Sequence, residues 1–190
     1  MKKLFVLGKI LKRDSKAIAV VGSRKMTERG RKLTSLFVGK LAKAGYTIVS
    51  GLAIGIDTVA HEAALKAGGR TIAVLGSGID IIYPDRNKDL AARIVNSGAI
   101  VSAFPKGTKP LGKNFLARNR IIVGLSKAVL VIEGARRSGT LSTASWAAND
   151  GKDVFAIPGS EATDWLIDQG ANVAKSPEEV IEYLDAADYR

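Results

Sequence analysis

The sequence predicts an α/β fold: an open, mostly parallel, doubly wound sheet with helices on both faces, in a single domain. Short apolar runs rich in Val and Ile alternate with longer amphipathic segments, which is typical of strands joined by helices. The runs are apolar on both faces, as expected for parallel strands that are covered on each side. A length of 190 residues suits one sizeable domain, and right-handed crossovers place its helices on both faces.

Six short runs are expected to form strands, because each is rich in Val and Ile and ends near a glycine or another turn residue. They are 17–22, 46–51, 70–76, 99–104, 128–134 and 152–159. In an open sheet of this kind, ligands bind beyond the carboxyl ends of the strands. The loops that follow these strands are therefore where a functional site is expected.

The segments between the strands, and one after the last strand, are expected to be helices. They are 27–44, 54–67, 87–97, 115–124, 140–150 and 176–187. In the first of them, Leu33, Phe37 and Leu41 recur at helical spacing and give one apolar stripe. The last begins with Ser176 at the N-cap and Pro177 at the first helical position, followed by two glutamates.

The net charge of +11 is distributed unevenly. Residues 160–190 hold eight acids and two bases, which leaves 27 bases and 10 acids on residues 1–159. Such an excess of positive charge attracts polyanions, nucleic acid first and anionic membranes second. The alternative is that a lysine-rich surface only keeps the protein soluble or reflects growth at high temperature. The chain has no cysteine, which excludes disulfides and thiolate metal sites and fits a reducing compartment.

The sequence gives no sign of a membrane segment. No apolar stretch approaches the roughly 20 residues that are needed to cross a bilayer. The basic start and short apolar run of residues 1–16 resemble a signal peptide faintly, but Gly8 and Lys9 interrupt the run and no cleavage site follows. We therefore expect a cytoplasmic protein.

Two strand-end loops have the features of phosphate-binding turns. "GSRKMT" (22–27) combines a glycine turn and a helix start with Ser23 and Arg24. It lacks the GxGxxG pattern of a dinucleotide site. "EGARRSGTLSTA" (133–144) forms a second such turn ahead of a helix, with candidate ligands in Arg137, Ser138, Gly139 and Thr140.

A third loop and the helix after it concentrate cations around an aromatic residue. Prolines stiffen the loop 104–115, which presents Lys106, Lys109 and Lys113. With a helix expected from residue 115, the following cations would lie near its start and oppose the helix dipole, which suggests a bound anion. Phe115 could then stack on a base, or it could lie in the core beneath the loop. The candidates on this helix are Phe115, Arg118, Asn119 and Arg120.

The remaining polar candidates favour structural roles. Asp57 falls in the first turn of a helix, where a carboxylate is a natural cap. His61 is the one histidine and has no second metal ligand near it in sequence, so we expect a packed or solvent-facing helical residue. Asp80 and Asp85 are poor evidence for a metal site. We expect neither a metal nor another cofactor.

Taken together and in order, the motifs resemble those of the DprA/Smf family of DNA-processing proteins. The resemblance spans residues 17–175. It rests on "GSRKMT", "VSGLAIGIDTVAHEAAL", "IAVLGSGIDIIYP", "FPKGTKP", "FLARNRIIVGLS", "EGARRSGTLSTA" and "VFAIPG". It implies an extended Rossmann-like domain (17–175), preceded by an N-terminal segment (1–16) and followed by an acidic helix (176–190) packed on the same domain. It also implies that Arg24, Lys106, Phe115, Arg118 and the "RSGT" turn line a DNA groove.

The resemblance also implies a function. Proteins of this family bind single-stranded DNA without sequence preference, form homodimers, protect incoming strands and help to load a RecA-type recombinase during natural transformation. The acidic end, 161–190, is the candidate surface for protein contacts. The first hypothesis is therefore a non-enzymatic single-stranded DNA-binding protein. The alternatives are a small-nucleotide-binding or nucleotide-hydrolysing enzyme, with Glu133 and then Asp57 as its acid or base, and a nucleotide-sensing scaffold.

Overall fold

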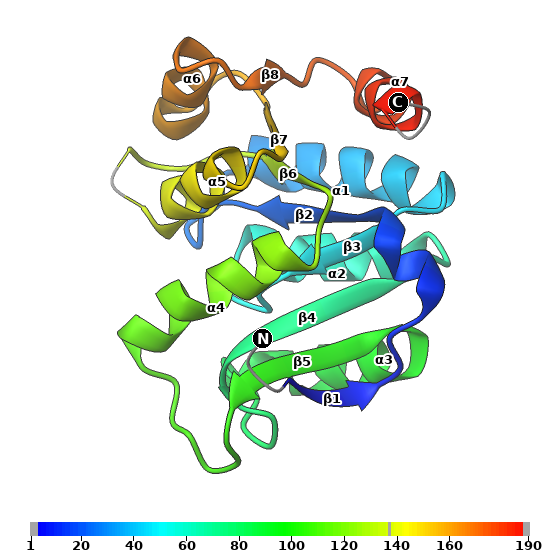
Figure 1. Cartoon of the computed structure of the whole chain (residues 1–190), viewed down its shortest axis with the longest axis vertical. Helices are drawn as coiled ribbons and strands as arrows, with labels where there is room; N and C mark the ends of the chain where they lie inside the picture. The colour runs from blue at the N-terminus through cyan, green and yellow to red at the C-terminus, as the bar shows by residue number, and fades with distance from the viewer. Residues whose placement is uncertain (1–3, 137, 188–190) are drawn as a thin grey trace.

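The computed structural model describes residues 4–136 and 138–187, and these residues form one eight-stranded sheet flanked by helices (Figure 1). The strands are β1 (Phe5–Gly8), β2 (Ala17–Val21), β3 (Thr47–Ser50), β4 (Thr71–Gly78), β5 (Ala99–Phe104), β6 (Ala128–Val131), β7 (Asp153–Ala156) and β8 (Asn172–Val173). The α-helices are α1 (Glu28–Lys43), α2 (Ile56–Lys66), α3 (Lys88–Ser97), α4 (Gly112–Gly124), α5 (Gly139–Asn149), α6 (Glu161–Asp168) and α7 (Pro177–Ala187). Two short 3-10 helices, η1 (Lys12–Lys16) and η2 (Asp85–Asn87), complete the description.

The strand order is β1-β5-β4-β3-β2-β6-β7-β8, and every neighbouring pair is parallel except β1 with β5. Helices α4 and α5 cover the face of the sheet that is turned toward the viewer in Figure 1, and α1, α2 and α3 cover the other. The predicted fold class is therefore confirmed. The chain winds outward from β2 in one direction through β5 and then crosses to β6, so the topological switch point lies between β2 and β6.

The strands bury side chains on both faces, as their continuous apolar pattern predicted. In β2, Ile18 and Val20 pack into a core cluster with side chains of α1 and α2. Ala19 and Val21 point the other way and join a second cluster with side chains of α4 and α5. Each of the two faces therefore has its own core, and the central strand β2 is shielded from water on both sides.

Three elements were not expected from the sequence, namely β1, α6 and β8. β1 lies at the sheet edge with most of its residues exposed, and β8 has two residues, so neither carries a strong apolar signal. The eight-residue α6 begins at a local device: the Ser160 side chain accepts the Thr163 N–H, and the Thr163 side chain returns a bond to the Ser160 backbone. These short elements depend on neighbours that the sequence does not reveal.

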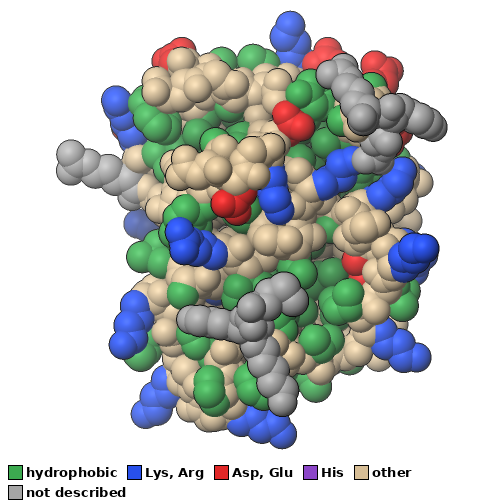
Figure 2. Space-filling view, viewed as in Figure 1, with side chains coloured by type: hydrophobic (Ala, Val, Ile, Leu, Met, Phe, Trp, Pro, Cys, Tyr) green, Lys and Arg blue, Asp and Glu red, His purple; other side chains and the backbone are tan. Residues whose placement is uncertain are grey.

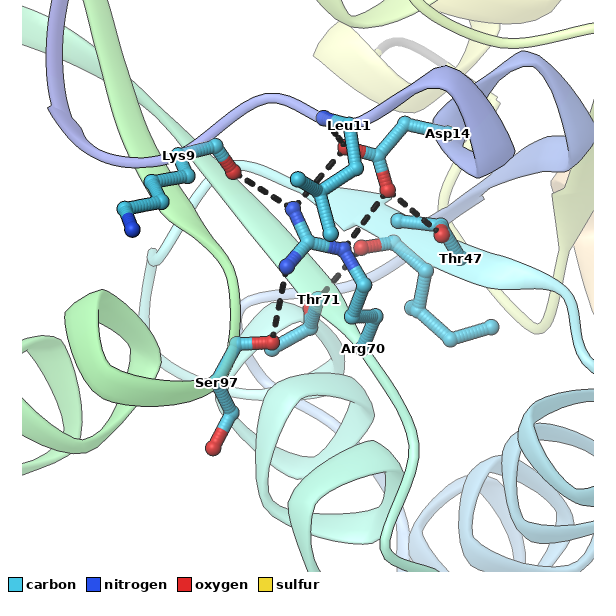
Figure 3. Close-up of polar contacts among 8 residues, drawn as sticks. Lys9, Leu11, Asp14, Thr47, Arg70, Thr71 and Ser97 are labelled. Carbon is cyan, nitrogen blue, oxygen red and sulfur yellow. Dashed lines mark hydrogen bonds and ion pairs between the residues drawn. The ribbon is translucent and has the colours of Figure 1, made fainter.

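A buried ion pair ties the N-terminal segment to the amino end of the sheet (Figure 3). Arg70 Nε and Nη2 donate to the two carboxylate oxygens of Asp14 at 2.7 and 2.9 Å. Asp14 also accepts the Thr47 hydroxyl at 2.9 Å, and Arg70 reaches the carbonyl of Lys9 at 2.5 Å. Burial raises the pKa of Asp14, but its hydrogen bonds, with Arg70 foremost, leave that pKa below its usual range.

The last helix, α7, packs on α1. Val180 and Leu184 are buried in the same core cluster as Phe37 of α1. At the surface, Lys40 of α1 lies 3.3 Å from the carboxylate of Glu178. The amphipathic pattern that predicted this helix thus corresponds to burial of its apolar stripe. No helix in residues 4–136 and 138–187 combines the length and the apolar character needed to cross a membrane.

Candidate nucleic-acid site

A cavity of about 790 Å³ opens at the carboxyl edge of the sheet, at the switch point between β2 and β6. Its walls come from the loop after β2, the loop after β6 and the adjoining face of α4. A volume of this size lies within the roughly 300–1,000 Å³ of ordinary ligand sites. The predicted site residues that line it are Ser23, Arg24, Phe115, Arg118, Asn119, Ser138, Gly139 and Thr140.

Phe115 has one packed side and one open side. Its ring leans on the β4 strand at Gly76, where even a Cβ atom would come within 2.6 Å of the ring. On the other side it faces the cavity, and the exposed guanidinium of Arg24 lies 5.1 Å from the ring centroid. The core and stacking interpretations of Phe115 are therefore compatible, since the strand fixes one face of the ring and leaves the other accessible.

The start of α4 is different from the prediction. The helix begins at Gly112, so Lys113 lies in its first turn, whereas Arg118 and Arg120 follow in later turns. The argument that these two arginines oppose the dipole at the helix start is therefore wrong. Arg120 is exposed, does not line the cavity, and places its guanidinium 5.4 Å from the ring centroid of Trp146.

Arg118 has a structural role in place of the predicted phosphate contact. Its side chain is buried, and Nη1 donates to the carbonyls of Gly51 and, at 2.7 Å, of Val74. A Cβ atom at Gly51 would overlap the guanidinium, so the glycine makes room for it. Burial lowers the pKa of Arg118, and the nearby Asp57 carboxylate opposes that shift. Arg118 thus joins α4 to the ends of β3 and β4 beneath the cavity.

The two acids and the histidine considered for catalysis are buried. Glu133 accepts the Thr27 N–H at 2.7 Å and the Thr27 hydroxyl at 2.6 Å, which places its charge at the start of α1. Burial raises the pKa of Asp57, an effect that the Arg118 charge opposes. His61 bonds Thr71 through Nδ1 at 2.7 Å, and burial lowers its pKa to about 3, so it is a packed neutral residue.

The start of α5 faces the cavity with its polar groups available. Ser138 occupies the N-cap, Gly139 and Thr140 follow, and all three line the cavity. Within the described part of the chain, the Ser138 side chain makes no capping hydrogen bond and its Oγ has no partner. The first turn of α5 carries no acid. Free N–H groups and a dipole directed at the cavity favour a bound anion here.

The other predicted site residues lie elsewhere or outside the description. Lys106, Lys109 and Lys113 are exposed on the loop and first turn ahead of Phe115, but they are not among the described residues that line the cavity. Asp80 holds this loop by accepting the Gly107 N–H at 3.0 Å. Arg137 lies outside the described residues. Contact of these side chains with DNA stays a prediction.

Comparison with known proteins identifies the family. Residues 2–185 match the family described as DNA recombination-mediator protein A. The chain belongs to this family. The resemblance to DprA/Smf proteins is thus confirmed, and one relative, the protein Smf of Escherichia coli, is 50% identical over 188 residues. That match covers 95% of this chain and 50% of the Smf protein, so the chain spans about half the length of this curated relative.

Two solved structures of the family share the fold closely. DNA processing protein A from Streptococcus pneumoniae superposes with a TM-score of 0.90 at 43% identity, covering 94% of this chain and 65% of that one. DNA processing protein A from Helicobacter pylori gives a TM-score of 0.90 at 32% identity, covering 98% of this chain and 88% of that one. The second structure was described for its single-stranded DNA binding mode.

Reasoning from the sequence missed one aromatic residue beside the site of this family member. Tyr83 lies in the loop after β4, is 50% exposed, and has its ring centroid 5.8 Å from that of Phe115. The sequence indicated only an ordered turn there. The available signal was its position, because a loop after a neighbouring parallel strand must reach the same edge of the sheet.

Charge on the visible face is segregated. In Figure 2 the acidic side chains gather mostly in the upper part, toward α6 and α7, whereas Lys and Arg dominate the lower part. The sequence division into an acidic end and a basic remainder is therefore also a division in space. Among residues 4–136 and 138–187, no cluster of three or more His, Cys, Asp or Glu side chains is arranged to hold a metal ion.

Proposed function

We propose that this chain is a sequence-independent single-stranded DNA-binding protein that acts in DNA processing and recombination, in the setting of natural transformation. The observation that carries the proposal is the cavity between β2 and β6. It places an aromatic ring with an open face, Phe115, across from the polar start of α5. An unpaired base can stack on the ring while its phosphate lies at the helix start.

The chemistry of the cavity favours a single strand of any sequence. Stacking tolerates every base, because each has a π-face. Arg24 is exposed at the rim, where its charge can hold a backbone phosphate. Lys106, Lys109 and Lys113 extend the positive rim along the neighbouring loop. The relatives support the proposal, since the Helicobacter pylori protein binds single-stranded DNA and others are named DNA processing proteins.

Fluorescence anisotropy of a labelled thymidine oligonucleotide tests the proposal. We expect binding that weakens steeply with salt, with a log–log slope of about −0.7 for each phosphate neutralised. Oligonucleotides of different sequence should bind alike, and the same oligonucleotide should bind less tightly after annealing to its complement. Tighter binding of the duplex, or binding that salt does not affect, would contradict the proposal.

Replacing Phe115 by alanine is expected to weaken single-stranded DNA binding about 5- to 150-fold, because stacking contributes about 1–3 kcal/mol per base. The dissociation constant measured by anisotropy checks this. Leu36→Ala is the matched control, since Leu36 is 50% exposed on α1 and does not line the cavity. An unchanged dissociation constant for Phe115→Ala in a folded variant would assign the ring to packing alone.

An enzymatic alternative has less support. A nucleotide hydrolase would need a general acid or base poised in the cavity. Glu133 lines it, but both carboxylate oxygens are bonded to Thr27 at the start of α1. Asp57 is buried beside Arg118. Incubation with nucleoside monophosphates, followed by chromatography, tests the alternative, and release of free base would favour it over the binding proposal. Tight mononucleotide binding without affinity for oligonucleotides would instead favour the nucleotide-sensing scaffold.

The wider role is proposed from the family. We infer that the protein acts in the cytoplasm as a homodimer, protects single-stranded DNA and helps to load a RecA-type recombinase. The acidic surface of α6 and α7 is the candidate for these protein contacts, because its charge is opposite to that of the DNA-binding side. Sedimentation of the free protein, and of its mixture with a RecA-type recombinase and DNA, tests both partnerships.

A further inference from the structure

A second, smaller cavity adjoins the first. Its volume is about 130 Å³, and Arg24 and Phe115 line both cavities, so the two are separated only by these side chains. On its far side it is bounded by Tyr83, Pro84 and Arg86 of the loop after β4. A strand that passes over Phe115 from the main cavity therefore meets this smaller cavity next.

The size and lining of the second cavity suit part of a nucleotide. Ordinary sites for whole ligands measure roughly 300–1,000 Å³, so 130 Å³ admits a single ring system and leaves the sugar and phosphate outside. Gly51, Ala53 and Ile54 contribute apolar surface and backbone to its walls. The exposed Arg86 adds a cation at the rim, where a backbone phosphate would lie.

Two aromatic rings frame the opening. The ring centroids of Tyr83 and Phe115 are 5.8 Å apart and their planes are inclined at 36°, which is a tilted rather than a stacked arrangement. Tyr83 is 50% exposed, so half of this large ring is not used for packing within the chain. Aromatic side chains with an exposed face are the usual platforms for unpaired bases.

The loop that carries Tyr83 is held in place. Asn87 donates from Nδ2 to the Leu52 carbonyl and to the Thr58 hydroxyl, each at 2.9 Å. Within the loop, the Ser77 hydroxyl donates to the Ile81 carbonyl at 2.6 Å. These bonds join the loop after β4 to the loop after β3 and fix Tyr83 before any ligand arrives. A ring that is already positioned costs less entropy to bind against than a mobile one.

We propose that Tyr83 and the 130 Å³ cavity form a second base site, which receives one unpaired nucleobase turned out of the stack and distinguishes single-stranded from double-stranded DNA. The inference rests on the proposed function. A duplex keeps its bases inside, so it cannot fill this cavity without the cost of unpairing and unstacking a base. The main cavity, with its helix start and Arg24, would hold the backbone of either form.

The test is a comparison of two single-stranded oligonucleotides of equal length, one with thymine bases and one abasic. Tyr83→Ala and Tyr83→Leu should each weaken binding of the thymine strand about 5- to 150-fold. Both should have much less effect on the abasic strand and on a duplex. Tyr83→Phe should retain wild-type affinity, since the ring rather than the hydroxyl is required. Leu36→Ala, with the same 50% exposure, is the control.

The possible results separate this inference from the proposed function. Wild-type protein that binds no single-stranded oligonucleotide would overturn both. Wild-type binding that Phe115→Ala weakens and Tyr83→Ala and Tyr83→Leu leave unchanged would overturn the second base site alone. Equal losses on the thymine and abasic strands would also overturn it, because the ring would then act on the backbone or on folding. Tyr83→Leu keeps the bulk of the side chain, so the comparison stands if the alanine variant fails to fold.

Discussion

Replacing Arg118 by alanine is expected to lower the free energy of unfolding by about 3–5 kcal/mol, the usual cost of removing one partner from a buried charge pair. The change leaves the Asp57 carboxylate buried without its counter-charge. It also leaves the carbonyls of Gly51 and Val74 without the donor that they have now. Urea denaturation followed by circular dichroism measures the loss.

The control for Arg118 is another cation of the same helix. Lys113 is exposed in the first turn of α4, so Lys113→Ala should change stability by less than about 0.5 kcal/mol. Single-stranded DNA affinity of the two variants should show the opposite order of directness, with any effect of Arg118 arising through displacement of Phe115. An Arg118→Ala protein as stable as the wild type but without DNA affinity would make Arg118 a phosphate ligand and contradict the structural role.

Replacing Arg70 by alanine is expected to cost a similar amount, about 3–5 kcal/mol of unfolding free energy. The variant leaves the Asp14 carboxylate buried and bonded only to neutral donors such as the Thr47 hydroxyl. It also releases the Lys9 carbonyl and with it the attachment of the N-terminal segment. DNA affinity should be preserved, because Arg70 precedes β4 and lies at the opposite edge of the sheet from the cavity.

A double-mutant cycle isolates the Asp14–Arg70 interaction. The variant lacking both side chains should be less destabilised than the sum of the two single changes, because neither charge is then left alone. The native pKa of Asp14 is lowered, so its ionised form contributes stability above the unfolded value of about 3.9. That contribution is lost as pH falls through the native pKa. Additive single effects would show that the pair is not coupled.

The sheet and the position of the site could be predicted from the sequence because burial on both faces leaves a strong local signal. The run 17–22, for example, is apolar at every position, and β2 is buried at every position. The glycine turns after β2 and β6 fall at one edge by topology alone. The loops 22–27 and 133–144 therefore met at the cavity without any detailed knowledge of side-chain contacts.

The roles of single cations could not be predicted in the same way, because a guanidinium looks alike in sequence whether it is exposed or buried. Arg24 and Arg118 were both expected to contact phosphate, yet one is exposed and the other is buried against backbone carbonyls. The difference arises from Gly51, a distant residue whose missing side chain admits Arg118. Tyr83 was missed for a related reason, since its value depends on Phe115, which lies far along the chain.

Photocrosslinking tests the central claim, that a single strand lies over Phe115 at the switch point of the sheet, most directly. An oligonucleotide that carries iodouracil is bound to the protein and irradiated, and the modified peptides are identified by mass spectrometry. The account predicts crosslinks in the peptides that contain Phe115 and Tyr83, which line the two adjoining cavities. Crosslinks confined to Trp165 of α6 or Tyr183 of α7, on the acidic side, would contradict it.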